Sequence, residues 1–370
     1  MDLLVSLDPG SSMTKVVYHV LSEIPNEPEI LFMEPDLLEV SKESIELYES
    51  RKIGNPCPEN EAWVKLGQEF YAVGFLAQKC FDARSNLEDL KYEKAILKVL
   101  AVVGAIAVKH NLSAQLNLSL ALLLPYGEWE DRKKLEFGLA DALSNFYFRG
   151  QHFKVILNVF QCKPEGGGLV LTRSKKLGVK FNSMNIAVLM LGYRDISSVV
   201  FEKGVSSGSS DKYGLTWMLK NIKNSTSGQN LTNLVKPVHL SGSSPAPKHF
   251  KSLAKSKKEE FRVEEISRLV QITAQSRKEY WNKIRDWISV NISGYMDLII
   301  IGGGTSKYFS KELKKYFSST EISWAAELER DVILAFDLPP RKDELALRFT
   351  DIYGLFLYLQ NTVYNMTNQG

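Results

Sequence analysis

Cysteine is scarce in this sequence, which has three among 370 residues: Cys57, Cys80 and Cys162. They lie far apart and form no paired spacing, which excludes a disulfide framework and a zinc or iron–sulfur site built on cysteine pairs. The five histidines show no ligand spacing either, which argues against a structural metal site. We expect a reducing compartment in which the thiols are buried.

Excess charge and long apolar runs are also missing. The formal net charge is only +3, which gives no overall electrostatic footprint for a nucleic acid or an anionic membrane. No apolar stretch reaches the roughly 18–20 residues that a membrane-spanning helix needs. The first residues, MDLLVSLDPG, contain an acid and no basic region before an apolar run, unlike a secretory signal peptide. We therefore expect a cytoplasmic protein without membrane association.

Length and composition predict a folded chain with two lobes. Hydrophobic residues make up 44% and charged residues 24% of the sequence, which excludes an intrinsically disordered chain. At 370 residues, the chain is long enough for two compact lobes, each with its own core.

Two strand–turn–strand patterns occur about half a chain apart, at 3–20 and 185–203. Helical spacing of apolar residues predicts helices over 90–110, 128–148, 212–222, 261–288 and 350–364. Strands that alternate with helices, with hairpins among them, predict an α/β fold with mixed sheets. The repeated hairpin indicates two lobes built on one plan. We also expect a turn at 204–210, rich in glycine and serine, and an exposed, mobile loop at 236–258.

The tip of the first hairpin has the sequence DPGSSMTK and carries groups that suit a phosphate. Gly10 allows close approach of the backbone, and the N–H groups from Gly10 to Ser12 can form an anion-binding concavity. Lys15 offers a point charge to a β-phosphate, and Asp8 would hold Mg2+ through water. The alternative is an ordinary hairpin turn with a solvated lysine.

A second glycine-rich stretch, IIIGGGTS at 299–306, places three glycines between a buried strand and a helix start. Bare backbone and the positive end of a helix dipole at one place suit a ligand with a flat base and phosphates. We expect Thr305 or Ser306 to cap that helix. The stretch lacks the spacing of a dinucleotide-binding fold and of a P-loop. A tight strand–helix turn without a ligand is the alternative.

Together, DPGSSMTK and IIIGGGTS resemble the first phosphate loop and the adenosine loop of the ATPase superfamily that contains actin, sugar kinases and heat-shock chaperones. Further stretches resemble the bacterial actin-like ATPases of the ParM/StbA type, which segregate plasmids. These stretches are LGQEFYAVGFLA, LLLPYGEWEDRKKLEFGL, PEGGG and FTDIYGLFLYL. The resemblance runs from Leu3 to about Leu359 and is poor through 21–61 and 223–258.

This resemblance implies a two-lobed, actin-like α/β fold made of duplicated ribonuclease-H-like mixed sheets with flanking helices. Lobe I would span 1–183 and be completed by 340–370. Lobe II would span 184–339 and carry the basic loop 236–258. ATP or GTP would bind with Mg2+ in a cleft between the lobes.

The resemblance also implies roles for individual residues. Asp8 matches the Mg2+-associated carboxylate, and Glu165 matches the glutamate that positions or activates the attacking water. From the residues alone, Glu165 is equally well a turn glutamate beside glycines. The residues that match the phosphate cradle are Gly10, Ser11, Ser12 and Lys15. Those that match the nucleoside-binding loop are Gly302, Gly303, Gly304 and Thr305.

The second phosphate loop, from Met190 to Asp195, departs from the family pattern. Gly192 is retained, but Met190 stands where the family has a metal-associated aspartate, and a thioether does not bind Mg2+. Asp195 takes that role if the turn is shorter than usual, with Arg194 compensating phosphate charge. The alternative is a surface ion pair of Arg194 and Asp195 that is worth little. We expect nucleotide binding with slow Mg2+-dependent hydrolysis.

The family resemblance further implies nucleotide-dependent filaments that serve plasmid or DNA segregation, with a DNA-binding adaptor protein as a partner. Met190 raises a second hypothesis, a nucleotide-binding scaffold or regulator with weak hydrolysis. A small-molecule kinase on the same fold is the third and least favoured, because no sugar-binding constellation is evident. The lysine-rich segment 248–262 could bind DNA, an adaptor or a neighbouring subunit. The alternative is a loop whose charged side chains are solvated and bind no partner.

Overall fold

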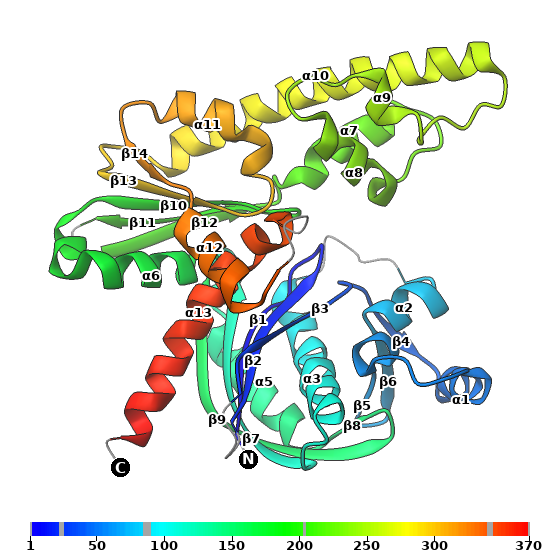
Figure 1. The fold of residues 1–370 in the computed structure, drawn as a ribbon, viewed down its shortest axis with the longest axis vertical. Coiled ribbons are helices and arrows are strands. Elements are labelled where there is room, and N and C mark those ends of the chain that lie inside the picture. The colour runs from blue at the N-terminus through cyan, green and yellow to red at the C-terminus, as the bar shows by residue number, and fades with distance from the viewer. Residues whose placement is uncertain (1, 22–25, 84–89, 203–204, 339–342, 369–370) are drawn as a thin grey trace. The chain divides into compact units, whose positions relative to one another are not determined.

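The computed structural model describes residues 2–21, 26–83, 90–202, 205–338 and 343–368. The chain divides into two compact units (Figure 1). Unit 1 comprises Met1–Leu177 and Ala326–Gly370, and unit 2 comprises Gly178–Ala325. Each unit is built on one β-sheet. The predicted lobe border between 339 and 340 lies outside the described residues.

The sheet of unit 1 has nine strands in the order β3-β2-β1-β7-β9-β8-β5-β6-β4. Its first three strands, β1 (Asp2–Asp8), β2 (Thr14–Leu21) and β3 (Glu29–Met33), form an antiparallel meander. β7 (Gln115–Leu124) and β9 (Gln151–Pro164) run parallel to β1. The remaining strands are β4 (Leu37–Val40), β5 (Trp63–Leu66), β6 (Glu69–Val73) and β8 (Phe146–Phe148). Because β1, β7 and β9 are parallel, the loops that follow them share one edge of the sheet.

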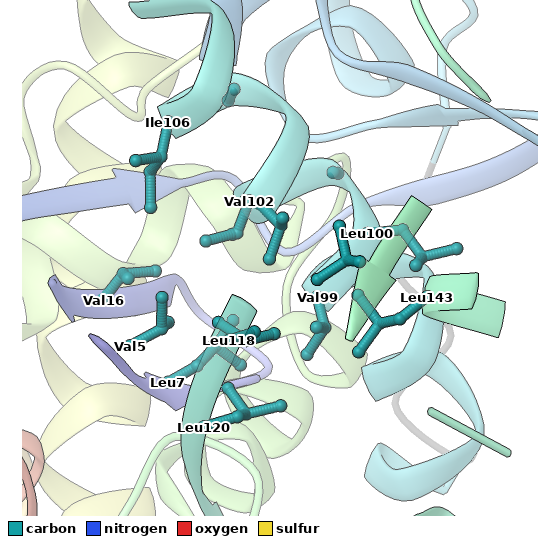
Figure 2. Packing of buried hydrophobic residues seen from close by; sticks show 14 of the residues in the cluster. Val5, Leu7, Val16, Val99, Leu100, Val102, Ile106, Leu118, Leu120 and Leu143 are labelled. Carbon is teal, nitrogen blue, oxygen red and sulfur yellow. The ribbon is translucent and has the colours of Figure 1, made fainter. Parts of the chain in front are cut away.

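Helices cover both faces of the central strands of this sheet. They are α3 (Lys91–Lys109), α5 (Arg132–Ser144), α6 (Gly167–Leu177), α12 (Ala326–Ala335) and α13 (Asp343–Thr367). On one face, Val5 and Val16 pack into the same cluster as Val99 and Ile106 of α3 (Figure 2). On the other face, Leu4 packs with residues of α13, because successive strand side chains point to opposite faces. Shorter helices are α1 (Lys42–Arg51), α2 (Phe75–Cys80) and α4 (Tyr126–Trp129).

Unit 2 repeats the central plan of unit 1 with five strands in the order β12-β11-β10-β13-β14. These are β10 (Ile186–Leu191), β11 (Ile196–Glu202), β12 (Val205–Asp211), β13 (Leu298–Gly302) and β14 (Glu321–Ser323). The first three are antiparallel, and β13 and β14 run parallel to β10. Its helices are α7 (Leu215–Asn224), α8 (Leu231–Ser241), α9 (Pro247–Phe250), α10 (Glu259–Asn291) and α11 (Ser310–Tyr316). The predicted α/β class with duplicated mixed sheets is confirmed.

One predicted turn is a strand. The segment expected to turn at 204–210 forms β12 from Val205 onward, which pairs with β11 along its whole length. β12 lies at the edge of its sheet, and its serine side chains are exposed or half-buried. A strand with no buried face lacks the apolar alternation by which strands are recognised in a sequence, and its pairing with β11 shows it to be a strand.

The predicted mobile loop at 236–258 is largely ordered. It begins within α8, contains α9, and places Val238, Phe250 and Leu253 in the core of unit 2. The backbone N–H of Lys255 also donates to Glu265, 2.9 Å away. Its lysines and prolines concealed these few apolar residues, and their burial orders the segment despite the composition.

The predicted helix at 128–148 is shorter than expected. α4 and α5 occupy its first part, and the chain then leaves the helix at Asn145 to form β8. Phe146 and Phe148 are fully buried in β8. Their aromatic side chains suit a strand, and burial in the core outweighs the continuation of the helix. By contrast, α3 and α10 follow the helices predicted at 90–110 and 261–288 closely.

The expectation that all three thiols are buried is wrong for two of them. Cys57 and Cys80 are exposed, whereas Cys162 is buried in β9. Burial raises the pKa of the Cys162 thiol to about 12, so its reactive thiolate is scarce near neutral pH. None of the helices in the described part of the chain is long and apolar enough to cross a membrane.

This difference predicts the thiol chemistry of the folded protein. With an aromatic disulfide reagent at neutral pH, we expect Cys57 and Cys80 to react promptly and Cys162 to react only after denaturant is added. The Cys162→Ser variant is the control and should lose only the reaction that follows addition of denaturant. Prompt reaction of all three thiols in the absence of denaturant would contradict the burial of Cys162.

Candidate functional site

The hairpin tip between β1 and β2 is a tight turn. Asp8 ends β1 and stands opposite Lys15 of β2 in the register of the two strands. A Cβ atom on Gly10 would lie 2.6 Å from the carbonyl oxygen of Met13, so the turn requires glycine there. The exposed Ser12 accepts a hydrogen bond from Arg348 of α13 at 2.8 Å, and Ser11 is half-buried.

Positive charge gathers around Asp8. Lys15 forms an ion pair with its Oδ2 atom. Burial raises the pKa of Asp8, but the charges of Lys15, Lys91 and Lys98 outweigh burial and hold that pKa below its usual value. Lys98 lies beneath the turn and donates to the carbonyl oxygen of Pro9 at 3.2 Å. Its own burial lowers the pKa of Lys98 to about 7, with the charge of Lys91 adding to the effect.

Glu165 lies at the same sheet edge as Asp8, directly after β9. Its backbone N–H donates to the carbonyl oxygen of Leu124, the last residue of β7, at 2.8 Å. Its side chain forms an ion pair with Lys91, the first residue of α3. The structure therefore brings Asp8, Lys15 and Glu165 to one edge of unit 1. Lys91 and Lys98 were not predicted as part of this group.

Asp351 of α13 is a further group that sequence reasoning missed. Its carboxylate accepts hydrogen bonds from the backbone N–H groups of Gly166 at 2.7 Å, Gly168 at 2.8 Å and Leu169 at 3.3 Å. These groups begin α6, so Asp351 satisfies the N-terminus of that helix. Burial raises the pKa of Asp351 to about 7. The hydrogen bond from Gly166 acts in the opposite direction, and the negative charge of Asp8 raises this pKa further. An acid within the apolar stretch FTDIYGLFLYL was the only sequence signal.

In unit 2, the two glycine loops are hydrogen-bonded to each other. The backbone N–H of Thr305 donates to Leu191 at 3.0 Å, and its hydroxyl donates to the carbonyl oxygen of Gly192 at 2.8 Å. Gly303 has a φ of +84°, and a Cβ atom there would overlap the carbonyl oxygen of Leu191. These contacts place Gly192 and the run from Gly302 to Thr305 side by side at one end of β10 and β13.

The predicted helix cap at Thr305 or Ser306 is wrong. A short 3-10 turn over Lys307–Phe309 follows instead, and α11 begins only at Ser310. The hydroxyl of Ser306 donates to the carbonyl oxygen of Gly303 at 2.7 Å. Both hydroxyls therefore donate to carbonyl groups of the two loops rather than accept from N–H groups of a helix.

Arg194 and Asp195 form a buried pair, so the alternative of a surface ion pair is wrong. The Nε atom of Arg194 lies 3.0 Å from Oδ1 and 2.7 Å from Oδ2 of Asp195. Their side chains are only 5% and 7% exposed. Met190 stands beside Gly302 in the register of β10 and β13. The negative charge of Asp195 is thus balanced within its own turn.

The residues of unit 1 fit a hydrated Mg2+ ion with a single protein carboxylate. The buried Oδ1 atom of Asp8 has no hydrogen-bond partner within the described part of the chain, and a water of a metal ion would satisfy it. Mg2+ in phosphate-binding sites commonly takes one or two carboxylates together with water and phosphate oxygens. Among the described residues, no group of three or more His, Cys, Asp or Glu is arranged to hold a metal ion by itself.

Comparison with protein-family models gives no match, and comparison with curated proteins gives none either. Solved structures do match over nearly the whole chain. The archaeal actin homologue Ta0583 has 13% identity and a TM-score of 0.60, with 97% of this chain and 99% of that chain covered. A 15-stranded ParM filament from Clostridium botulinum has 14% identity and a TM-score of 0.58 with the same coverage.

The Alp12 filament structure has 14% identity and a TM-score of 0.57, with 98% of this chain and 99% of that chain covered. Ta0583 and Bacillus thuringiensis ParM also match in structures that contain ADP. At these identities the likeness concerns the fold. The resemblance drawn from the glycine loops is confirmed at that level, and the chain has the actin-like fold shared by ParM and the archaeal actin homologue.

Proposed function

We propose that this protein binds ATP or GTP with Mg2+ and assembles into filaments in a nucleotide-dependent way. The observation that carries the proposal is the charged hairpin tip of unit 1, with Asp8 and Lys15 at its base, in a chain of actin-like fold. The ParM and Alp12 filament structures support self-association, and the ADP complexes of Ta0583 and ParM support a nucleotide.

In this proposal each unit contributes its own loops. The backbone N–H groups of Gly10, Ser11 and Ser12 and the ammonium group of Lys15 bind phosphate oxygens. Asp8 holds a water of the Mg2+ ion, which when bound neutralises phosphate charge. Glu165 accepts a hydrogen bond from the attacking water and orients it. In unit 2, the hydrogen-bonded loop Gly302, Gly303, Gly304 and Thr305 accommodates the nucleoside, with Gly192 of the neighbouring turn beside it.

Hydrolysis is expected to be slow. Met190 offers no ligand to Mg2+, and the Asp195 carboxylate is bound by Arg194. This buried pair also favours the second candidate function, a nucleotide-binding scaffold or regulator that hydrolyses weakly. DNA segregation, a DNA-binding adaptor and a cytoplasmic location are extensions of the same proposal, supported by resemblance to the ParM type.

Light scattering and pelleting test the proposal directly. We expect scattering of the purified protein to rise with ATP or GTP and Mg2+ and to stay low without nucleotide, because head-to-tail contacts do not close and therefore produce fibres. Electron microscopy would distinguish filaments from aggregates. A constant scattering signal across nucleotides and a wide range of protein concentrations would contradict the proposal.

Lys15→Met is the variant of choice for nucleotide binding, since it removes the charge nearest Asp8. We expect its affinity for a fluorescent ATP analogue to fall about tenfold, as for the loss of one charged contact to phosphate. Lys42→Met is the control. Lys42 is an exposed residue of α1, and it forms an ion pair with Glu46, which is also exposed. Equal affinities of the two variants would contradict the assigned role of Lys15.

A further inference from the structure

Two lysines on one face of α3 reach the loops that the proposed function assigns to phosphate and water. Lys98 donates to the carbonyl oxygen of Pro9 at the hairpin tip. Lys91 forms its ion pair with the Oε1 atom of Glu165. The charge of Lys91 also acts on Asp8. Lys91 therefore contacts the carboxylate assigned to the water, whereas Lys98 contacts the hairpin tip.

The position of Lys91 is unfavourable by itself. It is the first residue of α3, where the positive end of the helix dipole opposes a cation. Its side chain is only 8% exposed, so the ammonium group has lost most of its hydration. A buried ion pair adds little net stability, because the cost of desolvation offsets the attraction. The stability of α3 therefore does not account for a lysine at this position.

The surroundings of Glu165 indicate what the lysine does. The backbone of Glu165 is fixed by its hydrogen bond to Leu124 at 2.8 Å, and Gly166 is fixed by its hydrogen bond to Asp351 at 2.7 Å. With the backbone fixed on both sides, the rotamer of the Glu165 side chain sets the direction of its carboxylate, and the bond from Lys91 to Oε1 holds it in that direction. A carboxylate that orients water must be held in one direction to be effective.

We propose that Lys91 is a positioning residue for Glu165, which it holds in the direction needed to orient the attacking water. This inference rests on the proposed function. Lys91 acts through Glu165 rather than on the nucleotide, so its loss should reduce turnover far more than nucleotide affinity. Its effect should also depend on the carboxylate of Glu165.

The experiment measures phosphate release from ATP and affinity for a fluorescent ATP analogue, both with Mg2+. It compares Lys91→Met with Lys109→Met, a substitution on the same helix where the lysine pairs with Glu29 instead. We expect Lys91→Met to lower turnover about tenfold and to change affinity less than about threefold, since misplacing a catalytic group costs rate. Lys109→Met should leave both quantities unchanged.

The decisive comparison repeats the substitution in a Glu165→Gln background. There we expect Lys91→Met to change the residual turnover by less than about twofold, because the negative carboxylate that it positions is already gone. A merely structural role would slow both backgrounds by the same factor, and that result would overturn the inference, as would wild-type turnover in Lys91→Met.

Lys91→Arg provides the same comparison if the methionine variant does not fold, because it retains the charge in an altered geometry. Its effect on turnover should likewise vanish with Glu165→Gln, and an effect that persists would overturn the inference. A wild-type protein that binds ATP without releasing phosphate would overturn this inference alone. One that does not bind ATP or GTP at all would overturn the proposed function as well.

Discussion

Replacement of Gly168 by alanine is expected to lower the free energy of unfolding of unit 1 by about 3 kcal/mol. A Cβ atom at this position would overlap the carbonyl oxygen of Asp351 and lie 2.7 Å from the backbone nitrogen of Leu355. Both obstacles are backbone atoms of α13, which cannot rotate away as a side chain can. Alanine gains about 1 kcal/mol in helix propensity over glycine, which is less than the cost of the overlap.

The substitution should also weaken a second interaction. Moving α6 away from α13 lengthens the hydrogen bonds that Asp351 accepts from Gly166, Gly168 and Leu169. Urea unfolding followed by circular dichroism measures the change. Gly138→Ala is the matched control, because Gly138 is also helical but its Cβ atom would meet only the flexible end of Ile96, at 2.9 Å. Equal stability of the two variants would show that the two helices do not cross as closely as described.

Glu165→Gln is expected to reduce the rate of phosphate release from ATP by about 100-fold. This factor is at the lower end of the rate loss expected when a group that orients or activates water is removed. The amide keeps the size of the side chain and can still accept a hydrogen bond from Lys91. It loses the negative charge that attracts the proton of the attacking water. Affinity for ATP should change little, because the contribution of Glu165 arises during hydrolysis.

A phosphate-release assay under single-turnover conditions separates this step from nucleotide exchange. The control is Glu29→Gln, which removes another lysine-paired glutamate in the same unit, where Glu29 contacts Lys109. Hydrolysis that proceeds equally fast in Glu165→Gln and Glu29→Gln would remove Glu165 from the mechanism and would favour the weakly hydrolysing scaffold.

The parts of the fold that could be predicted are those in which local sequence and burial agree. β1 and β10 are apolar runs followed by glycine-containing turns, and α3 and α10 have regular apolar spacing. The serine-rich β12 could not be predicted, because its pairing with β11, rather than any buried face of its own, makes it a strand. Local composition also concealed the ordered part of 236–258, whose few apolar residues are held by the distant core.

The same distinction holds for the candidate site. Asp8 and Lys15 could be proposed from the sequence because they flank a glycine-containing turn, and Glu165 because the family resemblance points to it. Lys91 and Asp351 were missed because their partners are remote in sequence. The Lys91–Glu165 pair spans 74 positions, and the bond from Gly166 to Asp351 spans 185. Such pairs follow from the parallel strand order and the return of α13, and one segment read alone carries no sign of them.

The return of the chain to unit 1 fixes the order in which the two units can be completed during synthesis. Unit 2 is continuous from Gly178 to Ala325, so all of it leaves the ribosome before α13 does. Until α13 arrives, the N–H groups at the start of α6 lack the Asp351 carboxylate, and the apolar face around Leu4 is uncovered. During that interval the nascent chain contains all of unit 2 while unit 1 still lacks α13, and we expect chaperone binding to concentrate there.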